Sequence, residues 1–251
     1  MKLIMTEQSI RGKRHMIKKY KADNYDRGFL DQNMMGPNSI IILEELIENI
    51  ELKSDMRVLD LGCGKALSSI FLAKEFGAQV FAVDLWIEAS ENYKRLQQFQ
   101  VENLVIPLHA DAHQLPFANE YFDAVISIDA YQYFGYENEY YDKYLRPILK
   151  KGAWVAISIP GMKYELHKNV PDEMEPFWPE EALKTWHSVK WWKEKFADKL
   201  SEHQIKEMTC FDRAWGEWLS TENPYAVEDR KMMAADKGRY MNLVSITGKN
   251  I

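Results

Sequence analysis

A regular alternation of strand and helix patterns over residues 57–159 is the feature that most constrains the fold of this chain. Apolar runs typical of buried strands lie at 57–61, 79–84, 104–109, 123–129 and 153–159. Helical patterns lie at 39–50, 66–76, 87–101 and 137–149, with a short one near 113. Parallel strands need such crossover connections, because a tight turn cannot join them. The alternation predicts an α/β fold with a doubly wound, Rossmann-like sheet.

The final third of the chain departs from this rhythm. Strand-like segments at 204–211 and 240–247 flank a helix-rich stretch, which predicts a β-hairpin with a long insertion. The sheet should therefore have seven mainly parallel strands with an antiparallel last strand. We expect a helical arm and cofactor lid at 1–38, a core at 39–159 and the remainder of the core at 160–251. Helical lid insertions at about 160–187 and 212–238 should rise over the carboxyl edge of the sheet, where such folds bind ligands.

Length and charge narrow the function classes. The 251 residues, 46% of them hydrophobic, suffice for one buried core with additions. A formal net charge of -6 argues against a nucleic-acid partner, and the eight basic side chains within residues 2–27 predict a solvated helix. No stretch approaches the roughly 20 apolar residues of a membrane span, and the first residues lack an export signal. We expect a cytoplasmic protein without a disulfide framework, and whether it forms a homodimer is left open.

A glycine turn joins the first strand pattern to a helix in the segment Val58-Leu59-Asp60-Leu61-Gly62-Cys63-Gly64-Lys65-Ala66. The two glycines let the backbone approach a ligand, and the helix start adds partial positive charge. A dinucleotide site would have a third glycine at position 67, which is Leu67. A carboxylate at Asp60 would repel a diphosphate but could accept hydrogen bonds from an ammonium group. The turn therefore predicts a nucleotide-type ligand that is cationic at this point.

Acidic residues after the next two strands predict a nucleoside pocket. Asp84 ends the second strand, where a carboxylate can accept hydrogen bonds from both hydroxyls of a ribose. Trp86 can place its ring against a purine, and Asp111 can accept the amino group of adenine. Taken alone, each residue has a structural alternative, as a helix cap or a core ring. The order of these residues at strand ends favours a ligand site, which we assign to Asp84, Leu85, Trp86, Asp111 and Ala112.

These motifs resemble those of class I S-adenosylmethionine (SAM) methyltransferases over residues 39–159. The similarity lies in Asp60-Leu61-Gly62-Cys63-Gly64, Asp84, Asp111-Ala112, Phe122-Asp123-Ala124-Val125 and Leu149-Lys150-Lys151-Gly152. Within this family, the chain is most similar to the small-molecule branch with type 11 methyltransferase domains, which includes ubiquinone-pathway C-methyltransferases and cyclopropane-synthase-like enzymes. The resemblance implies methyl transfer from SAM, with S-adenosylhomocysteine as product.

The resemblance also assigns roles to residues of the turn and the strand ends. It implies that Asp60 and Gly62 hold the methionine part of SAM and that Cys63 and Gly64 belong to the same cofactor site. It likewise implies that Asp84 binds the ribose and Asp111 with Ala112 the adenine. Ala66 stands where the family usually has a third glycine, and its small side chain at a helix start should cost little.

The end of the fourth strand should face the methyl acceptor. Asp129, Tyr131 and Tyr133 are the catalytic candidates, because a carboxylate or phenol there could orient a nucleophile or take its proton. Asp129 could instead position backbone around the cofactor, and Tyr131 could merely pack. The chain lacks the Pro-Pro-Tyr-like motif that nucleic-acid amino-methyltransferases carry after this strand, and we interpret Asn223-Pro224-Tyr225 as a turn.

Aromatic side chains are concentrated in the lid segments. The candidate substrate-binding residues are Tyr25, Tyr131, Tyr164, Trp178, Trp186, Trp191, Trp215 and Trp218. Such rings could wall an apolar pocket or hold an amine by cation–π attraction, and the alternative is that they attach the lid to the sheet. His113, His167 and His187 could serve as bases. We expect no metal site, because no acidic or Cys partner lies at ligand spacing from them.

Residues 25–38 resemble the loop that closes over the cofactor in related methyltransferases, although a turn and helix cap would also explain Gly36-Pro37-Asn38. Two rival functions remain. A SAM-binding regulatory protein without turnover would show the same nucleoside pocket. An NAD(P)-dependent oxidoreductase shares the fold but conflicts with Asp60 and Leu67.

Overall fold

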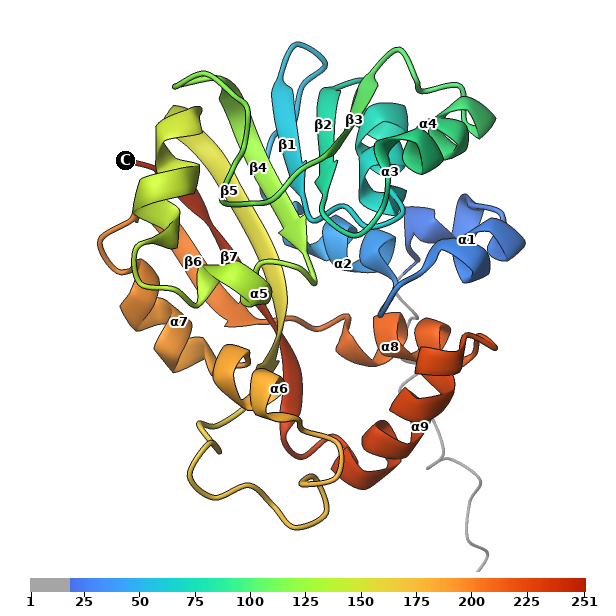
Figure 1. Cartoon of the computed structure of the whole chain (residues 1–251), viewed down its shortest axis with the longest axis vertical. Helices are drawn as coiled ribbons and strands as arrows, with labels where there is room; N and C mark the ends of the chain where they lie inside the picture. The colour runs from blue at the N-terminus through green and yellow to red at the C-terminus, as the bar shows by residue number, and fades with distance from the viewer. Residues whose placement is uncertain (1–18) are drawn as a thin grey trace, which may run out of the picture.

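A single seven-stranded sheet forms the centre of the computed structural model, which describes residues 19–251 (Figure 1). The strands are β1 (Arg57–Leu61), β2 (Gln79–Asp84), β3 (Val105–His109), β4 (Phe122–Ile128), β5 (Leu149–Met162), β6 (Leu200–Glu207) and β7 (Met241–Asn250). Their order is β3-β2-β1-β4-β5-β7-β6. The first five strands are parallel, and β7 runs antiparallel to both β5 and β6. The predicted doubly wound α/β fold with an antiparallel last strand is confirmed.

Alternate residues of each strand face two separate hydrophobic cores. In β1, Val58 belongs to one cluster, whereas Leu59 and Leu61 belong to the other. In β2, Val80 and Phe81 divide in the same way. Both faces of a parallel sheet are covered in this way because side chains alternate along a strand and crossover helices pack on either side. The arrangement brings the carboxyl ends of β1, β2 and β4 to one edge of the sheet.

Helices connect the strands and extend beyond them. They are α1 (Arg27–Asn33), α2 (Ser39–Leu46), α3 (Leu67–Phe76), α4 (Ala89–Gln98), α5 (Gln132–Gly135), α6 (Glu180–Thr185), α7 (Val189–Phe196), α8 (Phe211–Leu219) and α9 (Pro224–Asp236). Asn38 caps α2, since its side-chain oxygen accepts hydrogen bonds from the amides of Ile40 and Ile41. None of the helices in residues 19–251 combines the length and apolar character that crossing a membrane requires.

The prediction of a helix at 137–149 is wrong. A π-helical turn at Tyr141–Leu145 and a 3-10 turn at Arg146–Ile148 take its place, and β5 already begins at Leu149. Pro147 lacks an amide hydrogen and so cannot continue a helical hydrogen-bond ladder. The short helix expected near 113 is likewise only a turn, in which the amide of Gln114 donates to the carbonyl of Asp111.

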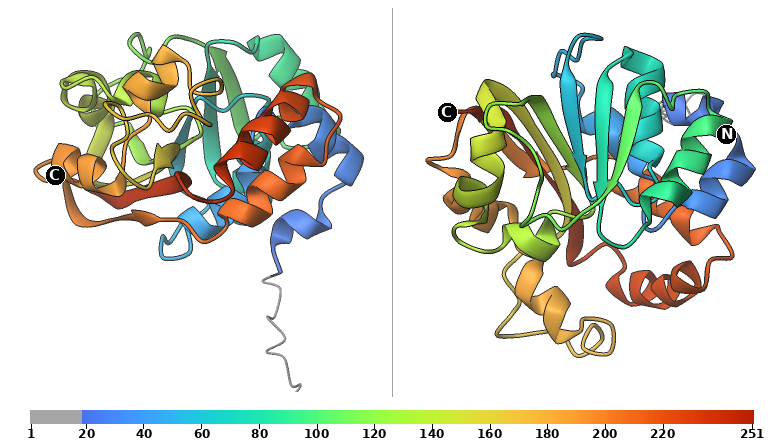
Figure 2. Two further views of the ribbon diagram at one scale, coloured as in Figure 1. Left: turned by 90° about the horizontal axis from the view of Figure 1, so that it is seen from below. Right: turned by 45° about the horizontal axis from the view of Figure 1, so that its top comes forward.

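Segments from the two ends of the described chain pack together. Figure 2 shows α8 and α9 beside the N-terminal helices, and α2 and α8 are in contact. The guanidinium of Arg27 lies 2.8 Å from a carboxylate oxygen of Glu217, and that of Arg213 lies 2.6 Å from Asp23. The late insertion thus holds the N-terminal segment against the core. Most of the predicted basic helix in residues 2–27 lies outside the described residues.

Candidate active site

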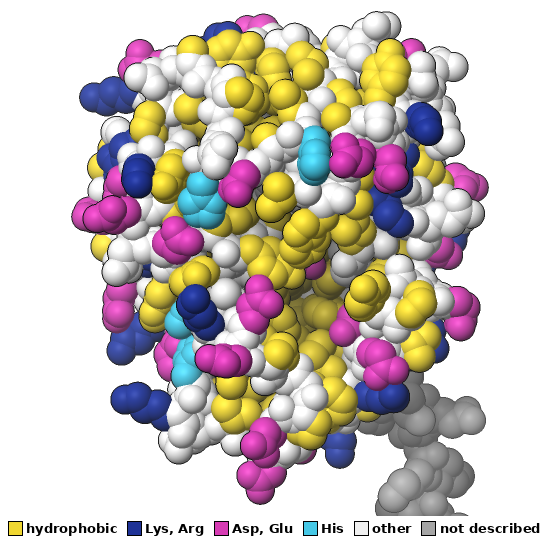
Figure 3. All heavy atoms as spheres, in the orientation of Figure 1, with side chains coloured by type: hydrophobic (Ala, Val, Ile, Leu, Met, Phe, Trp, Pro, Cys, Tyr) yellow, Lys and Arg dark blue, Asp and Glu magenta, His cyan; other side chains and the backbone are white. Residues whose placement is uncertain are grey.

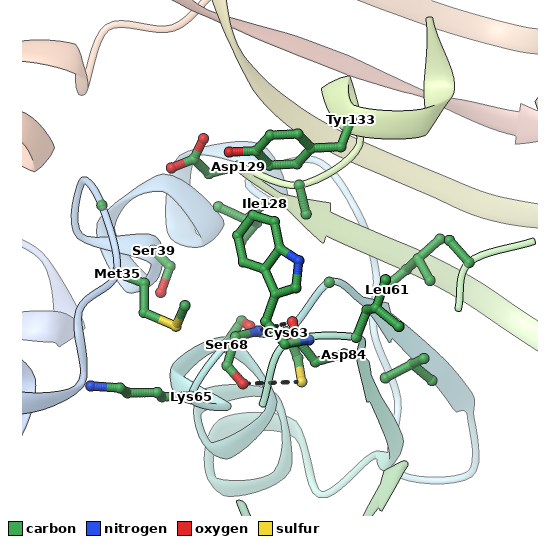
Figure 4. A pocket seen from close by; sticks show the side chains of 18 of the residues that line it. Met35, Ser39, Leu61, Cys63, Lys65, Ser68, Asp84, Ile128, Asp129 and Tyr133 are labelled. Carbon is green, nitrogen blue, oxygen red and sulfur yellow. Dashed lines mark hydrogen bonds between the residues drawn. The ribbon is translucent and has the colours of Figure 1, made fainter. Parts of the chain in front are cut away.

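A cavity of about 300 Å³ opens at the carboxyl edge of the sheet. Its walls come from Asn33–Pro37, Ser39, Leu61–Lys65, Leu67, Ser68, Val83–Trp86, Ala110–His113, Ile128–Ala130, Tyr133 and Phe134. Figure 3 shows that this face of the molecule is hollowed near its centre and that hydrophobic side chains gather around the hollow. Figure 4 shows Asp129 and Tyr133 on one side of the cavity and Cys63, Ser68 and Asp84 on the other. The cavity therefore joins the predicted cofactor segments to the end of β4.

The glycine turn after β1 is shaped by positive φ angles and close contacts. Gly62 has φ +75°, and a Cβ there would lie 2.2 Å from the Cβ of Ala130. The amides of Gly62 and Cys63 both donate to the carbonyl of Val83, at 2.8 and 3.0 Å, which ties the turn to β2. Glycine is required at position 62 by both space and backbone conformation.

Ala66 also adopts the left-handed conformation, with φ 62°. This conformation costs an alanine roughly 1 kcal/mol or more, because its Cβ crowds the following carbonyl. The expectation that this departure from the family pattern costs little overlooked the backbone conformation. Ala66 is fully buried at the N-cap of α3.

Asp60 lies beneath the turn rather than at its mouth. Its side chain is fully buried, and its Oδ2 accepts hydrogen bonds from the hydroxyls of Ser68 at 2.6 Å and Ser69 at 2.5 Å. Oδ1 has no partner among the described residues. Burial raises the pKa of Asp60 to about 6, although the two serines act to lower it. Alternation along β1 explains the position, because Asp60 shares the face of Val58 that α3 covers.

Asp84 borders the cavity and organises both loops around it. One carboxylate oxygen accepts the amide hydrogen bond of Gly64 at 2.8 Å. The other accepts those of Trp86 at 2.8 Å and Ile87 at 2.9 Å. Leu85 and Trp86 are more than half exposed, and the Trp86 ring lies edge-on to Tyr133 with centroids 5.2 Å apart. The structure therefore places Asp84, Leu85 and Trp86 together at the cavity wall, as the sequence predicts.

Asp111 and Ala112 form the next part of the wall. Asp111 accepts a hydrogen bond from the backbone amide of His113 at 2.8 Å, and the ring Nδ1 of His113 lies 2.9 Å from the same oxygen. These contacts lower the pKa of Asp111. The Nε2 of His113 lies 3.4 Å from Glu137. The ring of His113 is thus held between the carboxylates of Asp111 and Glu137.

Asp129 and Tyr133 form the opposite wall. Asp129 has φ 54°, and Gln132 donates a hydrogen bond to its Oδ1 at 3.2 Å. A Cβ at Gly36 would lie 2.6 Å from the Oδ2 of Asp129, so the N-terminal segment comes directly against this carboxylate. Burial raises the pKa of Asp129 to about 7. Burial, and then the charge of Asp129, raise the pKa of Tyr133 to about 12.

Tyr131 does not border the cavity. It is fully buried, its ring packs near Trp192 and Phe196, and its hydroxyl has no hydrogen-bond partner among residues 19–251. Residues two apart at a helix start point in nearly opposite directions, separated by about 200°. Since Tyr133 faces the cavity, Tyr131 must face the core. Its expected place among the acceptor-facing residues is therefore wrong.

The aromatic lid residues lie elsewhere. None of Tyr25, Tyr164, Trp178, Trp186, Trp191, Trp215 and Trp218 borders the cavity of the described chain. Three of them, Trp178, Trp215 and Trp218, are buried. Trp218 donates a hydrogen bond from its ring nitrogen to Asp229 at 2.8 Å, and Tyr25 packs near Phe71 and Phe99. The alternative interpretation, in which the rings attach outer segments to the core, fits Tyr25, Trp178, Trp215 and Trp218, whereas Tyr164 is 65% exposed.

Residues 33–37 border the cavity and belong to the segment 25–38, for which the sequence suggests closure over the cofactor. Sequence reasoning missed Ser39, Lys65 and Ser68, which border the cavity as well. Lys65 donates to the carbonyl of Gln32 at 2.9 Å, which ties the glycine turn to the segment 25–38. Gly36 could have pointed to a close approach in this segment, but nothing in the sequence pairs it with Asp129.

The reason given for expecting no metal site is also wrong. The structure brings Glu165 together with His167 and His187, so these histidines do have an acidic partner at ligand spacing. Only the contact with His187 is hidden in the sequence, because His187 lies 22 residues from Glu165, whereas His167 lies two residues from it.

Comparisons with known proteins identify the middle of the chain. The family model described as "Methyltransferase domain" matches residues 59–157. The cyclopropane-fatty-acyl-phospholipid synthase of Escherichia coli (strain K12) is 28% identical over 130 residues, which cover 50% of this chain and 32% of that protein. The chain thus spans about a third of the length of this curated relative.

Solved structures share the fold at lower identity. Phosphoethanolamine N-methyltransferase 2 of Haemonchus contortus, in complex with S-adenosyl-L-methionine, has a TM-score of 0.70 at 19% identity. That alignment covers 87% of this chain and 54% of the other. Geranyl diphosphate C-methyltransferase of Streptomyces coelicolor A3(2), in complex with Mg²⁺, geranyl diphosphate and S-adenosyl-L-homocysteine, has a TM-score of 0.63 at 16% identity. That alignment covers 90% of this chain and 79% of the other.

Proposed function

Residues 59–157 form a class I SAM-dependent methyltransferase domain, and on that premise we propose that this chain binds SAM in the cavity and methylates a small-molecule acceptor. The observation that carries the proposal is the arrangement of Asp60 and Asp84 around a glycine turn that closes one wall of the cavity. The carboxylate of Asp60 lies under the turn, and that of Asp84 lies beside it. A diphosphate bound at the turn would need positive charge there and would be repelled by both carboxylates. The site therefore favours a ligand with a cationic amino-acid part over a dinucleotide.

The residues present fit the methionine part of SAM. The unpartnered Oδ1 of Asp60 is a buried acceptor that lacks a donor. Its pKa, raised to about 6, would fall again beside an ammonium group, because a positive charge favours the carboxylate form. Gly62 and Gly64 border the cavity with their backbone, because neither carries a side chain.

The opposite end of the cavity fits a nucleoside. The Asp84 oxygen that accepts from Gly64 keeps a lone pair, whereas the other oxygen already accepts from both Trp86 and Ile87, so that Asp84 can receive a ribose hydroxyl. The exposed ring of Trp86 offers a face for stacking, and Asp111 offers a carboxylate for the adenine amino group. We assign these roles by position, and each remains a proposal.

Bound SAM would supply a methyl group attached to a sulfonium sulfur. The thioether that leaves after the transfer is neutral and needs no protonation. The chain's own contribution is then orientation, exclusion of water and removal of an acceptor proton. Asp129 suits the last task, because its pKa of about 7 lets it accept a proton near neutral pH. Tyr133 can orient the acceptor through its hydroxyl, and Met35 from the N-terminal segment helps to cover the cavity.

We propose an amine as the acceptor. The half-buried carboxylate of Asp129 attracts a cationic group, and the rings of Trp86 and Tyr133 border the same cavity. The relative from Haemonchus contortus is named as an amine methyltransferase, whereas the one from Streptomyces coelicolor is named as a carbon methyltransferase. An apolar acceptor is the second candidate, because the hollow has hydrophobic walls.

Calorimetric titration with S-adenosylhomocysteine and with NAD⁺ tests the cofactor. We expect binding of the first alone, with affinity at least ~10-fold weaker in Asp84→Asn because hydrogen bonds to a charged group are lost. Asp198→Asn serves as the control, since this side chain is 87% exposed. Binding of NAD⁺ without S-adenosylhomocysteine would overturn the proposal.

Methyl transfer from labelled SAM to a panel of small amines and apolar alcohols tests the acceptor. Tyr133→Phe should lower turnover of the accepted substrate about tenfold or more. Tyr131→Phe should leave turnover unchanged, because this hydroxyl is buried away from the cavity. Cofactor binding without transfer to any acceptor would favour a regulatory SAM-binding protein.

A further inference from the structure

A cluster of three metal-ligating side chains lies outside the cavity. Glu165 and His167 follow β5, and His187 directly precedes α7. The Oε2 of Glu165 lies 3.0 Å from the Nδ1 of His167 and 3.1 Å from the Nδ1 of His187. The ring centroids of the two histidines are 4.7 Å apart. Two imidazoles and one carboxylate oxygen thus converge on one point.

The second nitrogen of each ring faces a backbone carbonyl. The Nε2 of His167 lies 3.1 Å from the carbonyl oxygen of Trp186, and that of His187 lies 3.2 Å from the carbonyl oxygen of Lys184. Because a carbonyl only accepts, these two contacts are hydrogen bonds in the tautomer whose Nε2 carries the hydrogen. In the neutral rings, both Nδ1 lone pairs are then directed at the carboxylate of Glu165.

Three acceptors that face one another need positive charge between them. One proton would satisfy only one of the two rings, and two protons would place two imidazolium ions on neighbouring rings. Among residues 19–251, the ion pairs of Glu165 are those with His167 and His187, so no Lys or Arg supplies that charge. A divalent cation would be bound by all three atoms at once.

The surroundings also match a metal centre. Histidines that bind a metal commonly donate their other ring hydrogen to a backbone carbonyl, and carboxylate ligands are themselves hydrogen-bonded. Here the second oxygen of Glu165 accepts the amide hydrogen bond of Ser188 at 2.7 Å, and the ring of His187 stacks on Trp191 with centroids 3.8 Å apart. Both contacts hold the ligand atoms in place.

Ligand spacing and type indicate the metal. Tetrahedral zinc with bonds of about 2.0–2.1 Å separates its ligand atoms by about 3.3 Å, close to the distances from Glu165 to the two rings. Two imidazoles with one carboxylate suit zinc and its neighbours in the first transition row, whereas magnesium prefers oxygen ligands. The side chains are 37%, 25% and 12% exposed for Glu165, His167 and His187, so that a cation can enter from solvent.

We propose that Glu165, His167 and His187 form a binding site for one divalent transition-metal ion of the zinc type. The ion would link the segment after β5 to the start of α7, across a stretch of chain that contains only the short helix α6. None of the three ligands borders the cavity, so the site stabilises the outer segment and takes no part in methyl transfer.

Titration of untagged, metal-free protein with Zn²⁺, in the absence of SAM, tests this site. We expect one ion per chain and an affinity at least ~10-fold lower in Glu165→Gln and in His167→Ala. His109→Ala is the matched control, because His109 also pairs with a glutamate, Glu88 at 3.5 Å, and with a backbone carbonyl but lacks a third ligand. This control should bind Zn²⁺ like the wild type, and Mg²⁺ should not compete.

Two further measurements keep the test independent of folding defects and of the proposed function. Co²⁺ in place of Zn²⁺ should give the visible absorption of a site with nitrogen and oxygen ligands, and this signal should be lost in His167→Ala that retains the wild-type circular dichroism. Zn²⁺ should also slow proteolysis of residues 163–188. Absence of saturable Zn²⁺ binding, or equal binding by wild type, Glu165→Gln and His167→Ala, would overturn the proposal whether or not the protein methylates anything.

Discussion

The glycine turn at residues 60–66 and the aromatic insertions around α7 and α8 are held by different kinds of contact. In the turn, the contacts that matter join neighbouring strands within one motif, as when Gly62 and Cys63 both donate to Val83. In the insertions, rings are buried against partners from distant segments, as when Trp192 packs near Tyr131. A local motif therefore specifies a local geometry, whereas richness in tryptophan does not specify which side of the structure the rings face.

The largest expected effect is the difference in stability loss between truncating a buried tryptophan and truncating a tryptophan that borders the cavity. Trp192 is fully buried, so Trp192→Ala should lower the free energy of unfolding by roughly 3–5 kcal/mol. Trp86 is 65% exposed and borders the cavity. Trp86→Ala should change stability by no more than about 0.5 kcal/mol but weaken S-adenosylhomocysteine binding. Urea denaturation and calorimetry measure the two effects. A Trp192→Ala variant of unchanged stability would break the comparison.

The parallel strands β1, β2 and β3 could be predicted from the sequence, because each strand and the helix that follows or precedes it lie in one continuous segment. The cavity position of Asp84 and Asp111 follows from the same rule, since Asp84 ends β2 and Asp111 lies two residues after β3. The hydrophobic pattern shows where each strand ends, and the strand end determines where these two aspartates lie.

Other parts of the site depended on information that the sequence pattern lacks. Tyr131 and Tyr133 look equivalent in sequence, and only the phase of the short helix α5 places one in the core and one in the cavity. Glu165 and His187 meet because the chain between them folds back. Gly36 touches Asp129 for the same kind of reason. These are long-range contacts that periodicity does not encode.

Two glycines with the same backbone conformation sharpen the comparison within the core. Gly62 has φ +75° and Gly152 has φ +77°, but a Cβ at Gly152 would meet nothing within 4 Å. Gly152→Ala should cost about 1 kcal/mol of stability from the left-handed conformation. Gly62→Ala should cost roughly 2 kcal/mol more, because its Cβ would overlap Ala130, and should weaken S-adenosylhomocysteine binding. Equal unfolding free energies for the two variants would mean that the turn relaxes without cost.

The pH dependence of stability tests the burial of Asp129. Its pKa is raised from 3.8 to about 7, so the folded state holds the proton more tightly than the unfolded chain does. The free energy of unfolding that Asp129 contributes is therefore greatest in acid and falls as pH rises from about 4 to 7. Asp129→Asn stays neutral at every pH. Its stability relative to wild type should rise by roughly 1 kcal/mol or more between pH 5 and pH 8.

Urea denaturation at the two pH values measures this difference. The exposed Asp198→Asn serves as the control and should show no such change. A stability difference between Asp129→Asn and wild type that stays constant from pH 5 to pH 8 would mean that the carboxylate of Asp129 is solvated, and the proposed proton acceptor would lose its support.

The smallest effect concerns the one position in the turn where the chain departs from the glycine pattern. Ala66→Gly loses a buried methyl group and gains freedom in the unfolded chain, but it relieves the left-handed conformation, so its stability should stay within about 0.5 kcal/mol of wild type. Ala73→Gly, at a buried position inside α3, has no strain to relieve and should lose about 1 kcal/mol. Urea denaturation compares the two variants directly. If both variants lose the same free energy, the left-handed conformation of Ala66 costs the folded protein no measurable stability.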